Sequence, residues 1–251
     1  MAQRQFTSPA RKLVRKTLRY LARPVFNLVS KLEITGLENF PQSGPLIVVG
    51  NHFSFVDPAC FVRVAPPTLE FVGGSDMPHA PFVLRKFPLL WGYHPLYRGT
   101  GAKDSLRVAE GILKQGGILG IFPEAGNWAT VLRPARPGTA FLASRTGASL
   151  LPIGLVGMND IFPSLGRGRR ASIQINIGKP FGPFNAEGHG KKHRDQLEEI
   201  GHEIMRRIAE LIPPEKRGYY SDDPAIREAA KGTEVYPWAD KIEGQVRGVV
   251  R

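Results

Sequence analysis

The stretch "PLIVVGNHFSFVDPACFVRVA", residues 45–65, decides how the rest of the chain is interpreted. Its apolar run at 45–50 is short and rich in β-branched residues, which is typical of a buried strand. The segment 58–65 has the pattern of a helix, and Asp57-Pro58 suits a helix start, because Asp caps free N–H groups and Pro fits the first turn. The turn between these elements is polar. It contains Asn51, His52, Ser54 and Asp57.

Strand and helix patterns then alternate along the chain, which predicts an α/β fold with a mixed, largely parallel sheet covered by helices. We expect one α/β domain over residues 32–212, a basic amphipathic helical segment over 1–31 and a C-terminal tail over 213–251. The tail, rich in Pro, Gly and charge, is expected to be partly disordered or draped on the surface. Further strands are expected at 69–74, 94–99, 117–124, 149–157 and 171–178, helices at 103–116, 138–148 and 190–212, and a basic loop at 164–170.

The composition limits the classes of protein to which this chain can belong. The 251 residues carry a formal net charge of +12 and a single cysteine, Cys60, which excludes an intrachain disulfide. No stretch reaches the roughly 18 unbroken apolar residues of a membrane-spanning helix. A surface this positive attracts a polyanion, which could be nucleic acid, anionic lipid or a phosphorylated substrate.

The N-terminal segment concentrates that charge. Seven lysines and arginines lie between residues 11 and 31, before the first acid, Glu33. Apolar residues recur there at helical steps of three and four, and Pro24 is expected to kink or split the helix. Such a helix can lie in a membrane interface; the alternative is a surface helix packed on the domain with solvated arginines. The apolar positions are Val14, Leu18, Leu21, Val25, Leu28 or Val29, and Leu32.

Two polar sites follow directly on apolar strands, where an open α/β sheet places its reactive groups. His52 follows the strand at 45–50, and Glu124 stands at the end of the strand at 117–124. Asp57 could accept a hydrogen bond from one ring nitrogen of His52 and leave the other to take a proton from a hydroxyl. The alternatives are a helix-capping aspartate and an ordinary loop histidine. No G-x-S-x-G elbow signals a covalent acyl-enzyme.

"NHFSFVDP" resembles the N-H-x-S-x-x-D-P signature of the glycerolipid acyltransferases, the 1-acylglycerol-3-phosphate acyltransferase family within the lysophospholipid acyltransferase superfamily. Three further segments are similar to the family's second, third and fourth motifs, in the family's order, and one more is similar to its basic segment that leads into a helix. The resemblance covers about residues 32–212. The third motif, within residues 116–128, departs from the usual F-P-E-G-T-R-S, since Ala125, Gly126 and Asn127 stand where the family has Gly-Thr-Arg. The segments are "GYHPLYRG" (92–99), "GGILGIFPEAGNW" (116–128), "LRPARPGTAFLA" (132–143) and "LLPIGLVG" (150–157).

The resemblance implies roles for individual residues. His52 would be the general base and Asp57 would orient it. Arg98 would contact the acceptor phosphate, although it could be an ordinary surface arginine; Glu124 would order the acceptor's polar head, although it could be a structural salt bridge. Because the usual arginine is missing, Arg133 or Arg136 could supply its charge, or the acceptor could be another lyso-lipid. The implied substrate-binding residues are Asn51, Ser54, Arg98, Glu124, Asn127 and Arg136.

The expected activity is transfer of a fatty acyl group from an acyl thioester to a lysophospholipid, with 1-acyl-sn-glycerol-3-phosphate giving phosphatidate. The alternatives are another lyso-lipid acceptor, a thioesterase that activates water, and a basic membrane or nucleic-acid binder with a vestigial site. We expect no bound cofactor and no metal; acyl-CoA or acyl carrier protein would bring the thioester. The expected partners are a membrane phospholipid surface and a lysophospholipid, and not nucleic acid. We expect peripheral or monotopic attachment to the cytoplasmic face of the cell membrane; the sequence indicates no oligomeric state.

The segment 77–93 between the first two motifs is apolar and aromatic, with Arg85 and Lys86 in its middle. It could line a groove for the acyl chain or dip into the bilayer, and it could equally be ordinary core packing.

Overall fold

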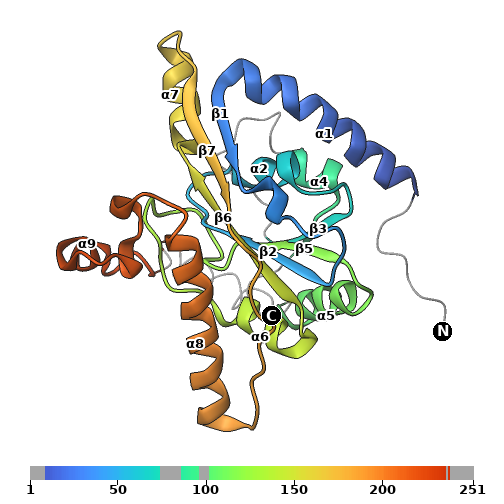
Figure 1. Cartoon of the computed structure of the whole chain (residues 1–251), viewed down its shortest axis with the longest axis vertical. Helices are drawn as coiled ribbons and strands as arrows, with labels where there is room; N and C mark the ends of the chain where they lie inside the picture. The colour runs from blue at the N-terminus through green and yellow to red at the C-terminus, as the bar shows by residue number, and fades with distance from the viewer. Residues whose placement is uncertain (1–8, 74–85, 96–101, 236, 238–251) are drawn as a thin grey trace, which may run out of the picture.

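A twisted sheet of seven strands runs through the part of the chain that the structure, a computed structural model, describes: residues 9–73, 86–95, 102–235 and 237 (Figure 1). The strand order is β1-β7-β6-β2-β5-β3-β4. Every neighbouring pair is parallel except β6 and β7, which are antiparallel. The predicted mixed, largely parallel sheet is therefore confirmed. The strands are β1 (Ser30–Thr35), β2 (Leu46–Gly50), β3 (Leu69–Gly73), β4 (His94–Pro95), β5 (Ile118–Ile121), β6 (Ser149–Val156) and β7 (Ala171–Ile177).

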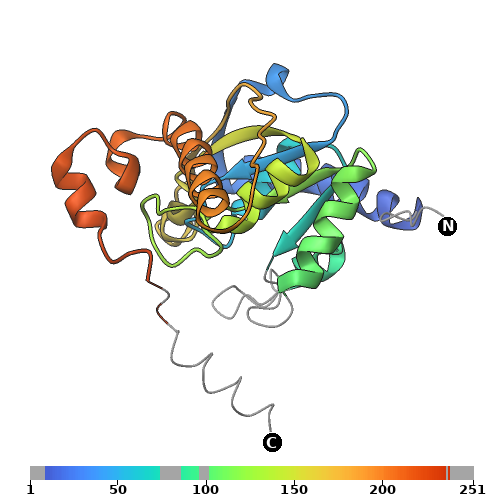
Figure 2. The ribbon, with the colours of Figure 1, turned by 90° about the horizontal axis from the view of Figure 1, so that it is seen from below.

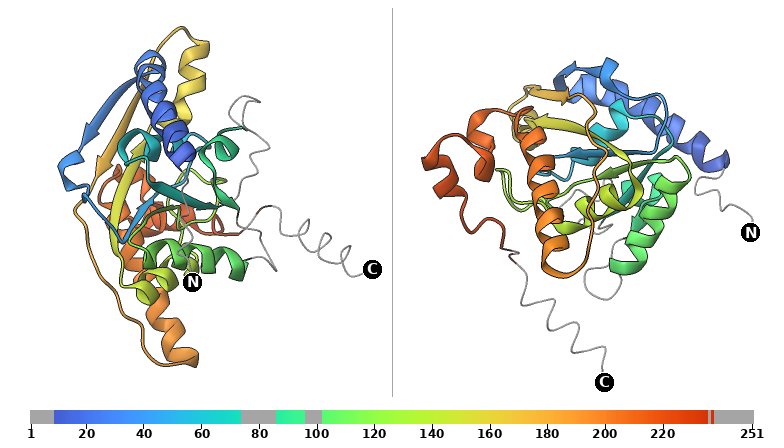
Figure 3. Two further views of the ribbon diagram at one scale, coloured as in Figure 1. Left: turned by 90° about the vertical axis from the view of Figure 1, so that its right-hand side faces the viewer. Right: turned by 60° about the horizontal axis from the view of Figure 1, so that its bottom comes forward.

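Helices cover both faces of the sheet (Figures 2 and 3). α1, α2 and α4 pack on one face, and α5, α6 and α8 pack on the other. The α-helices are α1 (Pro9–Val29), α2 (Asp57–Val64), α4 (Phe87–Trp91), α5 (Ala102–Lys114), α6 (Pro137–Thr146), α7 (Ile161–Gly166), α8 (Gly190–Ala209) and α9 (Pro224–Ala230). The 3-10 turns are η1 (Leu37–Asn39), η2 (Met158–Asp160), η3 (Pro214–Lys216) and η4 (Gly218–Tyr220).

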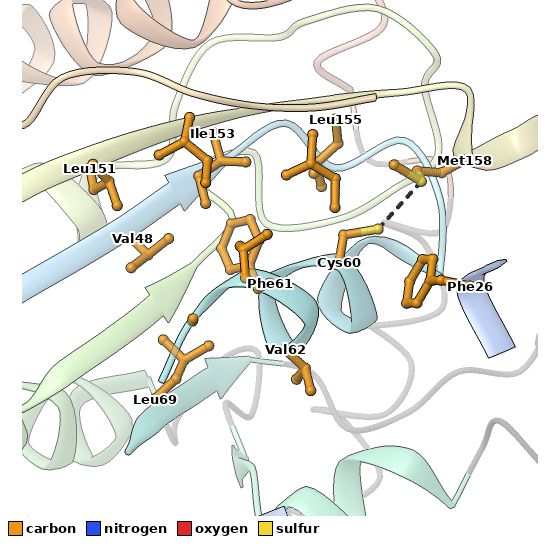
Figure 4. Packing of buried hydrophobic residues seen from close by; sticks show 14 of the residues in the cluster. Phe26, Val48, Cys60, Phe61, Val62, Leu69, Leu151, Ile153, Leu155 and Met158 are labelled. Carbon is orange, nitrogen blue, oxygen red and sulfur yellow. Dashed lines mark hydrogen bonds between the residues drawn. The ribbon is translucent and has the colours of Figure 1, made fainter. Parts of the chain in front are cut away.

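The central strand β2 shows why the apolar run at 46–50 folds as it does. All five of its residues are buried, since β5 and β6 flank it and helices cover both faces. Leu46 and Val48 join the core under α1, α2 and α4, part of which Figure 4 shows, whereas Ile47 and Val49 join the core under α5, α6 and α8. A strand buried on both faces is a continuous apolar run rather than an alternating one.

Three expectations about local structure need correction. The predicted helix gives way to strand β1 at Ser30, because Leu32 and Ile34 alternate toward the core while β1 pairs with β7. Pro24 does not split α1, which runs from Pro9 to Val29. The predicted loop at 164–170 begins as the last turn of α7.

The predicted C-terminal tail is described over residues 213–235 and at 237. Its described part folds onto the domain: Leu132 N–H donates to Lys216 O at 2.9 Å, and Tyr219 N–H donates to Leu132 O at 3.2 Å. Gly218 lies so close to this backbone that a Cβ there would be 2.3 Å from Leu132 O. The segment from Pro213 to Val235 is therefore an ordered layer around η3, η4 and α9.

Helix α1 belongs to the core as well as to the surface. Phe26 is buried, and Leu18, Ala22 and Val29 pack against the same cluster. Among the described residues, no helix is both long and apolar enough to cross a bilayer. The inner side of α1 is thus a structural face of the domain.

The strongest tie between α1 and the sheet is ionic. Arg15 is fully buried, and its Nη1 and Nη2 atoms donate to Glu70 of β3 at 2.8 and 2.7 Å. Its Nε donates to Trp91 O at 2.8 Å, and His94 Nε2 lies 3.2 Å from the Glu70 carboxylate. This cluster joins α1, β3, α4 and β4. Two aligned hydrogen bonds offset part of the cost of burying the charges.

We predict that Arg15→Ala lowers the free energy of unfolding by about 3–5 kcal/mol, because it leaves Glu70 buried without its guanidinium. Lys16→Ala removes the exposed neighbouring charge and should change stability by less than about 0.5 kcal/mol. Urea denaturation followed by circular dichroism measures both. Equal midpoints for the two variants would contradict a structural role for the buried pair.

Candidate active site

The site lies where β2 and β5 end side by side. The strands are parallel neighbours, with Val49 opposite Ile121, so the residues that follow each strand emerge at the same edge of the sheet. His52 N–H donates to Glu124 Oε1 at 2.8 Å, which joins the two predicted polar sites directly. Within the described residues, the structure therefore brings the first and third sequence motifs into contact.

Asn51 fixes the start of the turn after β2. It is fully buried; its Nδ2 donates to Leu155 O at 2.9 Å, and its Oδ1 accepts from Leu155 N–H at 2.7 Å. The side chain thus takes the place of a backbone partner for β6. Both ends of the Asn51 amide are therefore engaged with β6, which fixes the position of the turn.

The Asp57 carboxylate organises the turn. Its Oδ2 lies 3.0 Å from His52 Nδ1 and accepts from the amides of Phe53 and Ser54 at 2.8 and 2.7 Å. Asp57 is the first residue of α2, yet its carboxylate points backwards to groups that precede the helix, which a simple cap would not do. Burial raises the pKa of Asp57, and the hydrogen bonds from His52, Ser54 and Phe53 oppose that rise.

The imidazole of His52 is held in a defined orientation. Its ring stacks on Phe122 with centroids 4.3 Å apart. The side chain of His52 is 17% exposed, whereas that of Asp57 is 1% exposed. Because a carboxylate only accepts hydrogen bonds, Nδ1 carries the proton in this pair and Nε2 offers a lone pair. The arrangement can remove a proton from a group that approaches Nε2.

Ser54 is part of the turn itself. It is buried, and its Oγ accepts from Val56 N–H at 3.3 Å. This bond and the Ser54 N–H bond to Asp57 shape the backbone between His52 and α2. Ser54 therefore supports the turn from within, whereas the resemblance implied a substrate contact.

Glu124 lies beneath the turn as the centre of a second buried network. Its Oε2 accepts from Arg133 Nε at 3.1 Å and from Arg133 N–H at 3.3 Å. Burial raises the pKa of Glu124 to about 7, against the opposing effects of the Arg133 charge and the His52 and Arg133 amides. The guanidinium of Arg133 also donates to Gly126 O and lies over the Trp128 ring, 3.8 Å from its centroid.

The other predicted binding residues differ in how far they are buried. Arg133 is buried and bound to Glu124, so the guanidinium that could have replaced the family's usual arginine is already engaged. Arg136 is exposed at the start of α6, and Asn127 is exposed on the loop before it. Arg98 lies outside the described residues. In the segment 77–93, residues 77–85 also lie outside the described residues; of the rest, Trp91 is buried and Leu89 and Leu90 are exposed.

The C-terminal segment also holds this loop, a contribution that was not predicted from the sequence. Trp128 Nε1 donates to Thr233 O at 2.8 Å, and Arg136 Nη2 donates to Glu234 O at 3.1 Å. The Tyr219 hydroxyl donates to Glu234 Oε2 at 2.5 Å. A lone tryptophan in a polar loop was the available signal, but its partner lies 105 residues away.

Ala125 has a backbone conformation that costs energy. Its φ is +58°, in the left-handed region, where a side chain is disfavoured by about 1–2 kcal/mol. The third motif of the family usually has glycine here, so the alanine is a source of strain beside Glu124. The Ala125 N–H donates to Phe122 O at 3.0 Å, which closes the tight turn.

We predict that Ala125→Gly stabilises the protein by up to about 1 kcal/mol, because glycine adopts the left-handed region without strain. Gly147→Ala is the matched control: its φ is +63° and its Cβ would meet open space, so it should cost about the same amount. Denaturant midpoints measure both changes. A less stable Ala125→Gly variant would show that the alanine methyl group makes a contact worth more than the strain.

Comparison with known proteins gives a consistent result. A family model described as Acyltransferase matches residues 31–156. The chain is 27% identical over 136 residues to a 1-acyl-sn-glycerol-3-phosphate acyltransferase of Borreliella burgdorferi, covering 53% of this chain and 54% of that protein. It is 27% identical over 188 residues to the chloroplastic 1-acyl-sn-glycerol-3-phosphate acyltransferase LPAT1 of Arabidopsis thaliana, covering 72% and 49% respectively. It thus spans about half the length of the curated relatives it matches.

The fold has a solved counterpart. The crystal structure of the 1-acyl-sn-glycerophosphate (LPA) acyltransferase PlsC from Thermotoga maritima matches with a TM-score of 0.58 and 24% identity, over 80% of this chain and 81% of that one. That likeness supports the architecture. The region matched by the family model runs from β1 to the end of β6 and includes His52, Asp57 and Glu124. By this match, the chain belongs to the acyltransferase family.

Proposed function

We propose that this protein is an enzyme that transfers a fatty acyl group from a thioester to the hydroxyl of a lysophospholipid, with 1-acyl-sn-glycerol-3-phosphate as acceptor and phosphatidate as product. The observation that carries the proposal is the imidazole of His52, which a buried carboxylate fixes through Nδ1 while the side chain remains partly exposed. The names of the relatives in Borreliella burgdorferi and Arabidopsis thaliana support the choice of acceptor.

The geometry suggests a direct transfer. Asp57 holds the Nδ1 proton of His52, so Nε2 takes the proton of the acceptor hydroxyl. The hydroxyl oxygen attacks the thioester carbonyl carbon and forms the new C–O bond. The C–S bond then breaks, and the thiolate leaves and receives the proton that His52 held. Holding both substrates in line can contribute roughly 7–11 kcal/mol to such a reaction.

Nearby nucleophiles fit a covalent route poorly. Cys60 is fully buried with its Sγ 3.3 Å from Met158 Sδ, and burial raises the pKa of its thiol well above the usual value. The Ser54 hydroxyl is engaged in the turn. These placements favour attack by the acceptor itself. Either acyl-CoA or an acyl carrier protein could bring the thioester.

The acceptor's head group would meet the exposed loop that leads into α6. We propose that Arg136 and Asn127 contact it there, together with Arg98, which the resemblance suggests. Because Arg133 is bound to Glu124, it would support the loop rather than bind phosphate. Another lyso-lipid as acceptor, or water in a thioesterase reaction, remains the alternative that product analysis separates.

Helix α1 supports a membrane partner. Its inner face packs on the core, whereas six large apolar side chains on the outer side are exposed. Leu18 and Val29 pack inward, as expected of a helix packed on the domain, whereas the outward exposure of Leu21 and Leu28 supports the membrane interpretation for the opposite face. We propose peripheral or monotopic attachment to the cytoplasmic face of the cell membrane through this outer face. Its exposed residues are Leu13, Val14, Tyr20, Leu21, Val25 and Leu28.

We predict that His52→Ala lowers kcat by about 10²–10⁴-fold, because the general base is lost. His189→Ala, at the exposed start of α8, is the matched control and should keep full activity. Labelled acyl donor is incubated with and without lyso-lipid, and the products are identified by mass spectrometry. Full turnover by a folded His52→Ala variant would refute the proposal; free fatty acid as the main product would indicate the thioesterase.

We predict that Arg136→Ala raises KM for the phosphate-bearing acceptor about tenfold with little change in kcat, as expected for the loss of one charged hydrogen bond. Arg145→Ala, near the end of the same helix, should leave both constants unchanged. Steady-state kinetics with lysophosphatidate and with an uncharged monoacylglycerol measure the effect. An equal rise in KM for both acceptors would place Arg136 away from the phosphate.

A further inference from the structure

We propose that a patch besides the outer face of α1 binds the surface of an anionic phospholipid bilayer. We call it the α7 tip. It would hold the turn at residues 51–57, which we call the catalytic turn, against the bilayer. The α7 tip consists of Phe162, Leu165, Arg167, Arg169 and Arg170. The proposal rests on the proposed function in one respect: a lysophospholipid acceptor resides in such a surface. The sequence had suggested only a basic loop at this place.

The topology places the α7 tip at the active-site edge of the sheet. β6 runs parallel to β2, so both strands end at the edge where His52 lies. The chain then passes through η2 and α7 before β7 returns antiparallel to β6. In Figure 1 and in the left view of Figure 3, α7 lies beyond the strand ends and beside the C-terminal end of α1.

The side chains of the α7 tip combine exposed apolar groups with positive charge. Ile161 is buried and anchors the helix, whereas Phe162 is 43% exposed and Leu165 is 40% exposed. The three arginines that follow are exposed, and residues 161–171 contain no acid. Exposed apolar side chains beside several arginines complement an anionic bilayer, which offers hydrocarbon beneath a layer of phosphates.

Two contacts connect the α7 tip to its surroundings. The Phe162 ring lies 5.5 Å from the ring of Phe55, which is part of the turn between His52 and Asp57. Arg170 Nη1 donates to Asn27 O in the last turns of α1 at 3.1 Å. The α7 tip, the catalytic turn and the end of α1 therefore form one continuous surface.

The continuous surface of α1 and the α7 tip suggests what a bilayer contact would do for the reaction. On the outer face of α1, Val25 and Leu28 flank the residue that binds Arg170 and are strongly exposed. A bilayer that meets both α1 and the α7 tip would lie across the edge of the sheet where His52 opens. An acceptor could then reach Nε2 without its acyl chain leaving the hydrocarbon. A nucleic acid would use the arginines but leave Phe162 and Leu165 without a partner.

The test uses the full chain and two double variants of the α7 tip. Phe162→Ser with Leu165→Ser removes the apolar pair, and Arg167→Gln with Arg169→Gln removes two charges while keeping the Arg170 contact with α1. Leu37→Ser, an exposed leucine in η1, is the apolar control, and Lys191→Gln with Lys192→Gln at the start of α8 is the charge control. Flotation with phosphatidylglycerol–phosphatidylcholine vesicles measures binding.

We predict that each α7-tip variant loses about tenfold or more in vesicle affinity, since each charge near an anionic surface and each buried apolar side chain contributes severalfold. Turnover should fall similarly with a long-chain acceptor in vesicles. With a short-chain acceptor below its micellar concentration, kcat/KM of the Arg167→Gln, Arg169→Gln variant should remain unchanged. Both control variants should behave like the unmodified chain.

The outcomes separate the two proposals. Unchanged vesicle binding by both α7-tip variants would overturn the α7-tip proposal even if the enzyme is active. Lost vesicle binding in a chain that turns over neither acceptor would support the α7 tip and count against the proposed function. Weaker binding of the arginine variant to single-stranded DNA, together with unchanged vesicle binding by both variants, would identify a polyanion site and also overturn it.

Discussion

The carboxylate of Asp57 is the constraint on which the turn between β2 and α2 depends. One buried oxygen accepts N–H groups from the His52 ring and from two backbone amides, so a single charge fixes the side chain and the backbone around it. Burial penalises that charge and raises the pKa of Asp57, and the three donors offset part of the penalty. Because the donors lie only three to five residues upstream, the turn between β2 and α2 cannot change shape without stranding the carboxylate.

Hydrogen bonds from distant parts of the chain also hold this turn in place. Asn51 clamps its start to β6, and Glu124 binds its first amide from the end of β5. Glu124 in turn depends on Arg133, which stacks on Trp128, which is held by the C-terminal segment. The acidic residue that the sequence placed at the site is therefore a buried connector. This explains why a loop that lacks the family's usual Gly-Thr-Arg can still support the same turn.

The sequence of helix α1 left open which of its sides packs on the domain and which is exposed. Its buried side includes an arginine beside the apolar core contacts, and its outward side includes six exposed apolar residues, which an ordinary surface helix would not combine. Arg15 is retained inside because Glu70 and the Trp91 carbonyl receive its donors. The proposed bilayer contact would cover this exposed apolar stripe and complement the charge of the surrounding lysines and arginines.

The sequence alone determined the α/β class, the central strand β2 and the pairing of His52 with Asp57, because each depends on periodicity or on contacts within a few residues. It also indicated that His52 and Glu124 follow strands, from which their meeting at one edge could be expected. It could not show that Leu32 belongs to β1, that Arg15 is buried against Glu70, or that Arg133 is bound to Glu124 rather than facing a substrate. Those facts depend on pairings across 55 residues or more, or on which way a loop side chain turns, and only packing of the whole chain decides them. The same holds for the α7 tip, whose place beside the catalytic turn follows from the antiparallel return of β7.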